Sequence, residues 1–181
     1  MQKLNLGCGS KKLDGFVNID INKDVNPDKV VDLEKGKLPF KDDSVDHVVA
    51  NFVLEYIGEG FLPLLKEIYR VCESGAIVEI LATHPRHDDF LNDPRHKRPI
   101  TLNLLKSLGK KYSSWYKDFY SGNTGVAEEI DVDFEVMSQD HILEDDYLDL
   151  VRNNKTQEIN EIAKRFNNVF KALQVKLVVM K

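Results

Sequence analysis

The stretch L-N-L-G-C-G-S-K-K-L-D-G-F-V-N-I-D-I, residues 4–21, decides the fold. It places two short segments with alternating apolar residues, 3–6 and 16–21, on either side of a turn that contains Gly7 and Gly9. Such alternation is typical of β-strands. A strand that runs into a glycine turn is typical of the edge at which an α/β sheet binds a ligand. Glycine lets the backbone approach that ligand closely and point N–H groups at an anion.

The rest of the chain alternates between apolar segments and connections. Residues 61–72 carry apolar side chains at helical spacing, with Pro63 in the first turn and Ser74-Gly75 expected to end the element. This rhythm predicts an α/β fold with a doubly wound, mostly parallel seven-stranded sheet. The other predicted elements are strands at 29–33, 45–51, 76–82, 130–137 and 175–180, a short helix at 102–108 and an amphipathic helix at 158–173.

Polar side chains stand where successive predicted strands end. Asp20 closes the second strand, where a carboxylate can accept hydrogen bonds from both hydroxyls of a ribose. Asp32 closes the third strand and can accept a bond from an adenine amine, while Ile21 and Leu33 can clamp the flat base. Asn51 closes the fourth strand, beside the reactive end of such a ligand. Either acid could instead cap a helix or stand in a solvated turn, but the four strand ends together predict a nucleoside site.

Composition sets the broad class of the protein. The chain has 181 residues, of which 42% are hydrophobic, and we expect one domain over residues 1–181. The first strand begins almost at once and no apolar run is long enough to span a bilayer, so we expect neither a secretory signal nor membrane insertion. Cys8 and Cys72 are interpreted as reduced thiols, which favours a cytoplasmic protein.

Charge patterning argues against a general nucleic-acid surface. The formal net charge is −5, so we expect no nucleic-acid partner. Basic residues gather between Arg86 and Lys117, and acidic residues gather between Lys117 and Arg152, which we interpret as solvated faces. The loop that follows the fifth predicted strand also combines histidines with carboxylates, and such clusters can bind metals. It has no H-E-x-x-H motif or cysteine pair, so no metal is predicted there; the histidines are His84, His87 and His96.

Three motifs in order resemble the class I S-adenosylmethionine (SAM)-dependent methyltransferases, in particular the type 11 group. They are residues 4–21, the run D-L-E-K-G-K-L-P-F-K-D-D-S-V-D-H-V-V-A-N-F-V-L-E-Y-I at 32–57, and K-E-I-Y-R-V-C-E-S-G-A-I-V-E-I at 66–80. The resemblance covers about residues 3–83 and implies a Rossmann-like fold, SAM as cofactor and S-adenosylhomocysteine as product. Tyr56 stands where the group often has histidine, and residues 73–76 replace its usual proline-glycine-glycine turn.

The resemblance also implies roles for individual residues. Asp20 would hold the ribose, Asp32 with Leu33 the adenine, and Asn51 the methionyl end, with the adjacent Phe52 included in the site. Only ten residues separate Gly9 from Asp20, too few for a second strand and a full crossover helix, so the first helix is expected to be truncated. This shortening resembles methyltransferase-like proteins associated with surface-polysaccharide assembly. The residues of the glycine turn that would line the methionine moiety of the cofactor are Gly7, Cys8 and Gly9.

A lid over the site is expected from residues 84–125, which carry aromatic and basic side chains. Aromatic faces suit a sugar or planar acceptor, and basic groups suit an acceptor with a carboxylate or phosphate. The segment D-P-R-H-K-R-P-I-T, residues 93–101, resembles one found after the fifth strand in related proteins, and it makes His96 the candidate general base. The aromatic residues are Tyr112, Trp115, Tyr116, Phe119 and Tyr120, and some of them could simply pack on the sheet.

Two other functions are compatible with parts of this pattern. A nicotinamide-dependent oxidoreductase needs a third small residue three positions after the second glycine, where this chain has Lys12. A non-catalytic SAM-binding or scaffold protein remains an alternative, because a fold does not fix a function. The favoured hypothesis is a SAM-dependent methyltransferase that acts on a small-molecule or glycan-type acceptor.

Overall fold

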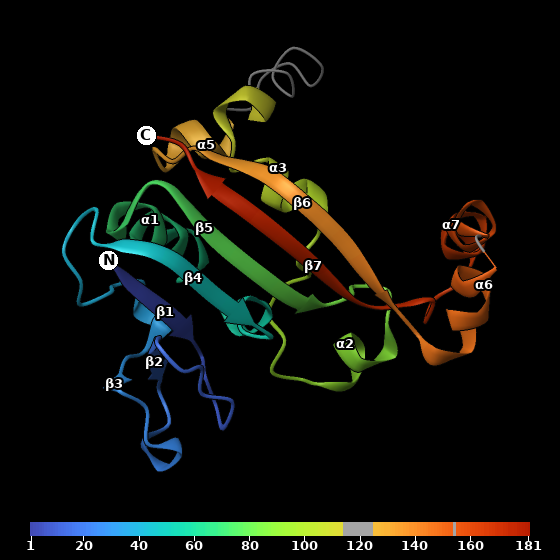
Figure 1. The fold of residues 1–181 in the computed structure, drawn as a ribbon, viewed down its shortest axis with the longest axis horizontal. Coiled ribbons are helices and arrows are strands. Elements are labelled where there is room, and N and C mark those ends of the chain that lie inside the picture. The colour runs from blue at the N-terminus through green and yellow to red at the C-terminus, as the bar shows by residue number, and fades with distance from the viewer. Residues whose placement is uncertain (114–124, 154) are drawn as a thin grey trace.

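The computed structural model describes residues 1–113, 125–153 and 155–181. One seven-stranded sheet organises the fold, with strand order β3-β2-β1-β4-β5-β7-β6 (Figure 1). The strands are β1 (Gln2–Leu6), β2 (Val17–Asp20), β3 (Lys29–Val30), β4 (Val45–Asn51), β5 (Cys72–Thr83), β6 (Phe134–Leu143) and β7 (Phe170–Val179). Neighbouring strands from β3 to β5 are parallel, whereas β7 runs antiparallel to both β5 and β6. The predicted mostly parallel seven-stranded α/β fold is confirmed.

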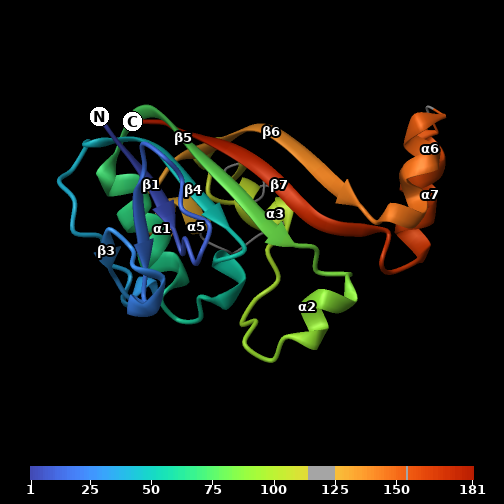
Figure 2. The same cartoon turned by 60° about the horizontal axis from the view of Figure 1, so that its bottom comes forward.

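The helices whose bounds lie within the described residues are short apart from two. They are α1 (Phe61–Val71), α2 (Asp88–Asn92), α3 (Leu102–Lys106), α5 (Val126–Glu129), α6 (Leu148–Arg152) and α7 (Thr156–Arg165), with 3-10 helices η1 (Lys23–Val25), η2 (Leu33–Lys35), η3 (Leu54–Tyr56) and η4 (Asp145–Tyr147). In Figure 2, α1, α3 and α5 lie along the same side of the sheet. The β6–β7 pair extends past the other strands and carries α6 and α7 at its far end (Figure 1).

The core lies between the central strands and α1. Alternate residues of the strands, such as Leu6, Ala50 and Ile80, are at most 1% exposed and share one cluster with Leu64 and Ile68 of α1. The other face of these strands includes polar pairs: His47 Nε2 lies 2.9 Å from Glu79 Oε1. The alternation of buried and less buried side chains is the sequence pattern that predicts a strand, because the side chains on one face must be apolar to pack against a helix.

The expected truncation of the first helix is confirmed, since no helix joins β1 to β2 in the described residues. Two buried asparagines stabilise the connection instead. Asn5 Nδ2 donates to Lys11 O at 3.0 Å and to Asn18 Oδ1 at 2.9 Å. The same Asn18 Oδ1 accepts from Leu13 N at 2.8 Å. Side-chain amides thus satisfy backbone groups that a helix would otherwise pair.

The C-terminal third differs from the sequence prediction. The predicted helix at 158–173 ends at Arg165, because the chain turns at Asn168, whose φ is 58°, and residues 170–179 then pair with β5 as strand β7. The predicted strand at 130–137 begins only at Phe134, after a turn at Asp131. Long-range strand pairing overrides the helical spacing that Val169, Phe170 and Leu173 share with the preceding helix.

Two smaller boundaries also differ. Ser74-Gly75 does not end the α1 region, because β5 starts at Cys72 and passes through both residues, so the strand predicted at 76–82 is longer. The third strand is shorter than predicted and covers Lys29–Val30 alone. The predicted aromatic residues Trp115, Tyr116, Phe119 and Tyr120 lie outside the described residues, as does part of the expected lid.

Candidate functional site

A cavity of about 430 Å³ opens at the carboxyl ends of β1, β2, β3 and β4. This is the edge at which open α/β sheets bind ligands, where the strand order reverses between β1 and β4. Its volume lies in the range of small-molecule sites, roughly 300–1,000 Å³. The lining residues are Gly7, Asp20, Ile21, Val31, Asp32, Leu33, Glu34, Phe52, Val53, Tyr56, Ile57 and Arg95.

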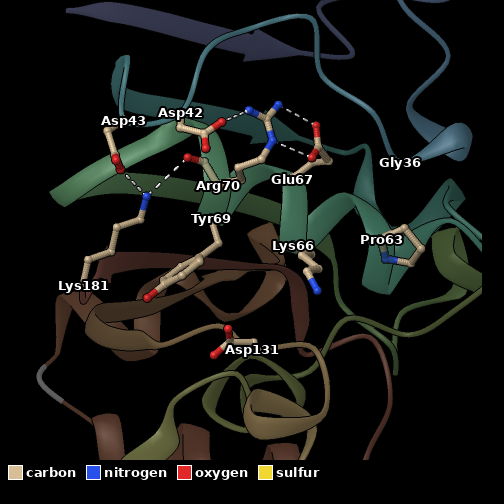
Figure 3. A pocket seen from close by; sticks show the side chains of 10 residues that line it. All are labelled: Gly36, Asp42, Asp43, Pro63, Lys66, Glu67, Tyr69, Arg70, Asp131 and Lys181. Carbon is tan, nitrogen blue, oxygen red and sulfur yellow. Dashed lines mark hydrogen bonds and ion pairs between the residues drawn. The ribbon is translucent and has the colours of Figure 1, made fainter.

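A second cavity of similar volume lies beside α1 (Figure 3). Its charged groups are largely engaged with one another: Arg70 pairs with Glu67 and Asp42, and Lys181 pairs with Asp43. Asp42 and Asp43 precede β4, so this cavity lies at the amino end of that strand. Position and internal charge pairing both favour the first cavity as the functional site.

Six of the nine predicted cofactor residues line the first cavity: Gly7, Asp20, Ile21, Asp32, Leu33 and Phe52. The other three are not among its lining residues. Cys8 is buried, and this burial raises the pKa of its thiol. Asn51 ends β4 with an exposed side chain, and Gly9 continues the turn after β1.

Asp20 is held by backbone donors on both oxygens. Gly9 N donates to Asp20 Oδ2 at 2.8 Å, and Asn22 N donates to Asp20 Oδ1 at 2.8 Å. Each carboxylate oxygen has a second acceptor position, so the oriented group can still accept two hydroxyls of a ligand. The amides of the glycine turn are less available than the sequence suggests, because Gly9 N is engaged here and Cys8 N donates to Ile19 O at 2.9 Å.

Asp32 serves as a helix cap as well as a lining residue. Its side chain accepts from Glu34 N at 3.1 Å and caps η2. Glu34 in turn accepts from Gly58 N at 2.7 Å and Gly60 N at 3.0 Å, and these backbone donors lower the pKa of its carboxyl group. The bonds tie the end of β3 to the segment that leads into α1, which fixes one wall of the cavity.

The backbone is in the left-handed region at Gly7 and at Phe52. Gly7 has φ +59°, and a Cβ atom added there would lie 2.3 Å from Val53 Cγ2. Phe52 has φ 54° and a side chain 43% exposed, while its N–H donates to Leu81 O at 2.6 Å. A non-glycine residue in this region carries strain, and such strain clusters at ligand sites.

Tyr56 connects the cavity to the loop that follows β5. Its hydroxyl donates to Asp93 Oδ2 at 3.0 Å, and its ring packs against His96 with centroids 4.6 Å apart. Burial, followed by the bond to Asp93, raises the pKa of the Tyr56 hydroxyl, so it stays protonated at neutral pH. The guanidinium of Arg95 lies 5.5 Å from the centroid of the same ring.

Glu55, the residue before Tyr56, anchors the loop that follows β5. Glu55 is fully buried, and its Oε1 accepts from Thr83 N at 3.0 Å and Thr83 Oγ1 at 3.1 Å. Its backbone carbonyl accepts from Lys97 N at 2.7 Å. One residue thus fixes the end of β5 and the returning loop together, which sets Arg95 and His96 beside the cavity.

The candidate base His96 is oriented by its own loop. His96 Nδ1 lies 2.8 Å from Phe90 O, and the two rings stack with centroids 4.9 Å apart. A carbonyl oxygen only accepts, so Nδ1 carries a proton, and in the neutral tautomer the lone pair is on Nε2. His96 does not line the cavity itself but contacts Tyr56, which does.

The other two histidines of this loop have different surroundings. His87 Nε2 lies 2.7 Å from Glu144 Oε1, and His84 packs against His141 and Phe170 on the β6–β7 pair. Burial lowers the pKa of His84 to about 4 and also lowers the pKa of His141. Within residues 1–113, 125–153 and 155–181, no three histidine, cysteine or acidic side chains are grouped to hold a metal ion.

Sequence reasoning missed several residues of the wall. Glu34, Tyr56 and Ile57 lie in the second resembling motif but were assigned no role, and Arg95 was considered only as part of a basic lid. A usable signal was their position directly after β3 and β4, because residues that follow a strand's carboxyl end reach the same edge. Arg95 has no such signal, because the path of the loop after β5 brings it to the cavity.

Comparison with known proteins gives one family match and several structures with a similar fold. Residues 4–80 match a family model described as a methyltransferase domain, and no curated protein sequence matches the chain. A SAM-dependent methyltransferase from Archaeoglobus fulgidus superposes with a TM-score of 0.62 at 16% identity, covering 98% of this chain and 85% of that one. One from Mesorhizobium loti gives 0.59 at 14% identity, covering 98% and 90%.

A third structure was solved with the cofactor present. Phosphoethanolamine N-methyltransferase 2 from Haemonchus contortus, in complex with SAM, gives a TM-score of 0.56 at 12% identity, covering 100% of this chain and 50% of that one. At such identities the likeness shows the fold, a Rossmann-like α/β fold that the chain shares with these methyltransferases. Among the described residues no helix is long and apolar enough to cross a membrane.

Proposed function

We propose that this chain, whose residues 4–80 match a methyltransferase domain, is a SAM-dependent methyltransferase that binds its cofactor in the strand-end cavity. The observation that carries the proposal is the set of side chains that meet there. Asp20 and Asp32 supply acceptors at the ends of adjacent strands, and Ile21 and Leu33 supply apolar surface between them. This set suits an adenosine, with its diol, its exocyclic amine and its flat base.

The cavity fits the cofactor by chemistry as well as by volume. Asp20 is oriented by Gly9 N and Asn22 N, so its remaining acceptor positions are directed before a ligand arrives. Phe52 offers an exposed ring at the end of β4, where it can pack against the base. Cys8, Gly9 and Asn51 complete the proposed cofactor set as neighbours of the lining residues.

When bound, SAM supplies a methyl group on a sulfonium, which is a good leaving group. We propose that His96 acts as general base through Nε2, since Nδ1 is held by Phe90 O. His96 takes the proton of an acceptor hydroxyl while that oxygen bonds to the methyl carbon, the carbon–sulfur bond breaks, and its electron pair stays on sulfur. Tyr56 and Phe90 hold the imidazole between them, which supports this orientation.

The acceptor is proposed to be a small molecule or a glycan. The aromatic faces of Tyr56 and Phe90 beside His96 suit a sugar ring or a planar group. We also place the reaction in the cytoplasm, because both cysteines are free and buried.

The test separates binding from turnover. We expect S-adenosylhomocysteine to bind with a Kd in the micromolar range or below, and SAM to be consumed when an acceptor is supplied. His96→Ala should leave the affinity for S-adenosylhomocysteine within about threefold and lower methyl transfer by roughly 10²-fold, as for the loss of a general base.

Each contrary result has a distinct meaning. Absence of binding at millimolar S-adenosylhomocysteine, by calorimetry and by thermal shift, would refute the cofactor assignment. Binding without turnover on any acceptor would favour the non-catalytic alternative. Loss of both binding and activity in His96→Ala would place His96 in the cofactor site or in the fold.

A further inference from the structure

The first cavity has an uneven distribution of charge. Three carboxylates line it, those of Asp20, Asp32 and Glu34. Among the described residues that line it, Arg95 is the one cation, and it comes from the loop after β5. A bound group with negative charge would be repelled by the acidic wall and attracted at Arg95 alone.

Arg95 is fixed in place by neighbouring side chains. Asp93 Oδ1 accepts from Arg95 N at 2.9 Å and from Arg95 Nε at 2.9 Å, and Asp93 Oδ2 accepts from Arg95 Nη2 at 2.6 Å. The Tyr56 ring lies under the guanidinium. Within the described part of the chain Nη1 has no hydrogen-bond partner, so its two N–H groups remain available in a preorganised fork.

Two backbone donors of the glycine turn at this edge are already engaged. Gly9 N bonds to Asp20, and Cys8 N bonds to Ile19 O. Fewer backbone amides are therefore left for an anionic ligand group, and Arg95 is the charged donor among the described lining residues.

We propose that Arg95 binds the α-carboxylate of the cofactor, at the opposite end of the ligand from the groups held by Asp20 and Asp32. The inference rests on the proposed function. The cofactor carries positive charge on its amino group and, as SAM, on sulfur, so its carboxylate is the one group that the acidic wall disfavours. Arg95 binds it through the Nη1 N–H groups, while Asp93 and the Tyr56 ring hold the guanidinium in position.

Two ligands provide the test, one with the amino-acid group that carries the carboxylate and one without it. S-adenosylhomocysteine carries the amino acid, whereas 5′-methylthioadenosine keeps the adenosine and the thioether sulfur without it. Calorimetry on the full chain should show that Arg95→Met weakens S-adenosylhomocysteine binding by roughly 10- to 100-fold, the range for a hydrogen bond to a charged group. The affinity for 5′-methylthioadenosine should stay within about twofold.

Lys97→Met is the matched control, because Lys97 is a cation of the same loop that does not line the cavity. It should leave both affinities unchanged. Equal weakening of both ligands by Arg95→Met would show that Arg95 acts through the packing of Tyr56, and no change in either would show that it binds nothing there; both results overturn the inference. Failure of the wild-type protein to bind either ligand would instead refute the proposed function.

Discussion

Replacement of Gly7 by alanine tests how the turn after β1 is built. The φ of +59° disfavours any residue with a Cβ atom, at a cost of about 1–2 kcal/mol. The added Cβ would also lie 2.3 Å from Val53 Cγ2, and overpacking of this kind costs about 1–3 kcal/mol. We therefore expect Gly7→Ala to lower the free energy of unfolding by about 2–5 kcal/mol.

Gly9→Ala is the matched control. Gly9 has a similar φ of +49°, but a Cβ atom added there would have no neighbour within 4 Å. Its expected loss is the conformational cost alone, about 1–2 kcal/mol. Urea unfolding followed by circular dichroism measures both variants under the same conditions.

The Val53 contact is isolated by a double-mutant cycle. If the overlap is the cause, Val53→Ala should offset part of the loss in Gly7→Ala, with a coupling of about 1–3 kcal/mol. Equal losses for Gly7→Ala and Gly9→Ala, with additive effects of Val53→Ala, would refute the steric part of this reasoning.

Three further predictions concern binding and pH. Asp20→Ala should weaken the binding of S-adenosylhomocysteine by roughly 10- to 100-fold in calorimetry, because hydrogen bonds to a carboxylate contribute about 1.5–3 kcal/mol. Asp32→Ala should weaken binding less, since one neutral amine donates there. Normal binding by a folded Asp20→Ala variant would show that Asp20 does not hold the ribose. The pKa values of His84 and His141 are lowered in the folded chain, so the unfolded chain takes up protons at a higher pH than the folded chain does. Their contribution to stability should therefore be complete above about pH 6.5 and fall as the pH drops toward 4. If the urea midpoint of His84→Phe changed with pH as much as that of the wild-type protein, this prediction would be contradicted. Duplex DNA and RNA should bind weakly at about 150 mM salt, and a sub-micromolar Kd by fluorescence anisotropy would disprove this.

The sequence predicted the part of the fold in which local patterns and long-range pairing agree. In β4, residues 45–51 include three valines, follow a turn-forming stretch at 41–44 and also pair with β1 and β5, so the prediction has the observed bounds. Near the C-terminus the two disagree. Residues 166–173 continue a helical spacing, yet Ala172 and Leu173 pair with β5, and sequence periodicity alone cannot detect that partner.

The same distinction applies to the candidate site. Asp20 and Asp32 could be predicted because a carboxylate at a strand end must reach the ligand-binding edge, whatever follows it in the chain. Arg95 could not be predicted, since its position depends on two hydrogen bonds made by its neighbours. The Tyr56 hydroxyl donates to Asp93, and Lys97 N donates to Glu55 O. Residues placed by tertiary contacts in a loop carry no periodic signal.

Loss of the first crossover helix leaves the cavity in place because strand ends, rather than helices, form it. In a full crossover, helical hydrogen bonds would satisfy the backbone between β1 and β2. Here the buried pair Asn5 and Asn18 does so, and Asn18 Nδ2 also donates to Asp28 Oδ2 at 3.0 Å. Asn18 N donates to the same Asp28 oxygen at 2.7 Å, which binds β2 to the approach of β3. The position of Asp20, two residues further along β2, is therefore set by a polar network beneath the cavity, and Asn18→Leu should reduce ligand binding as well as stability.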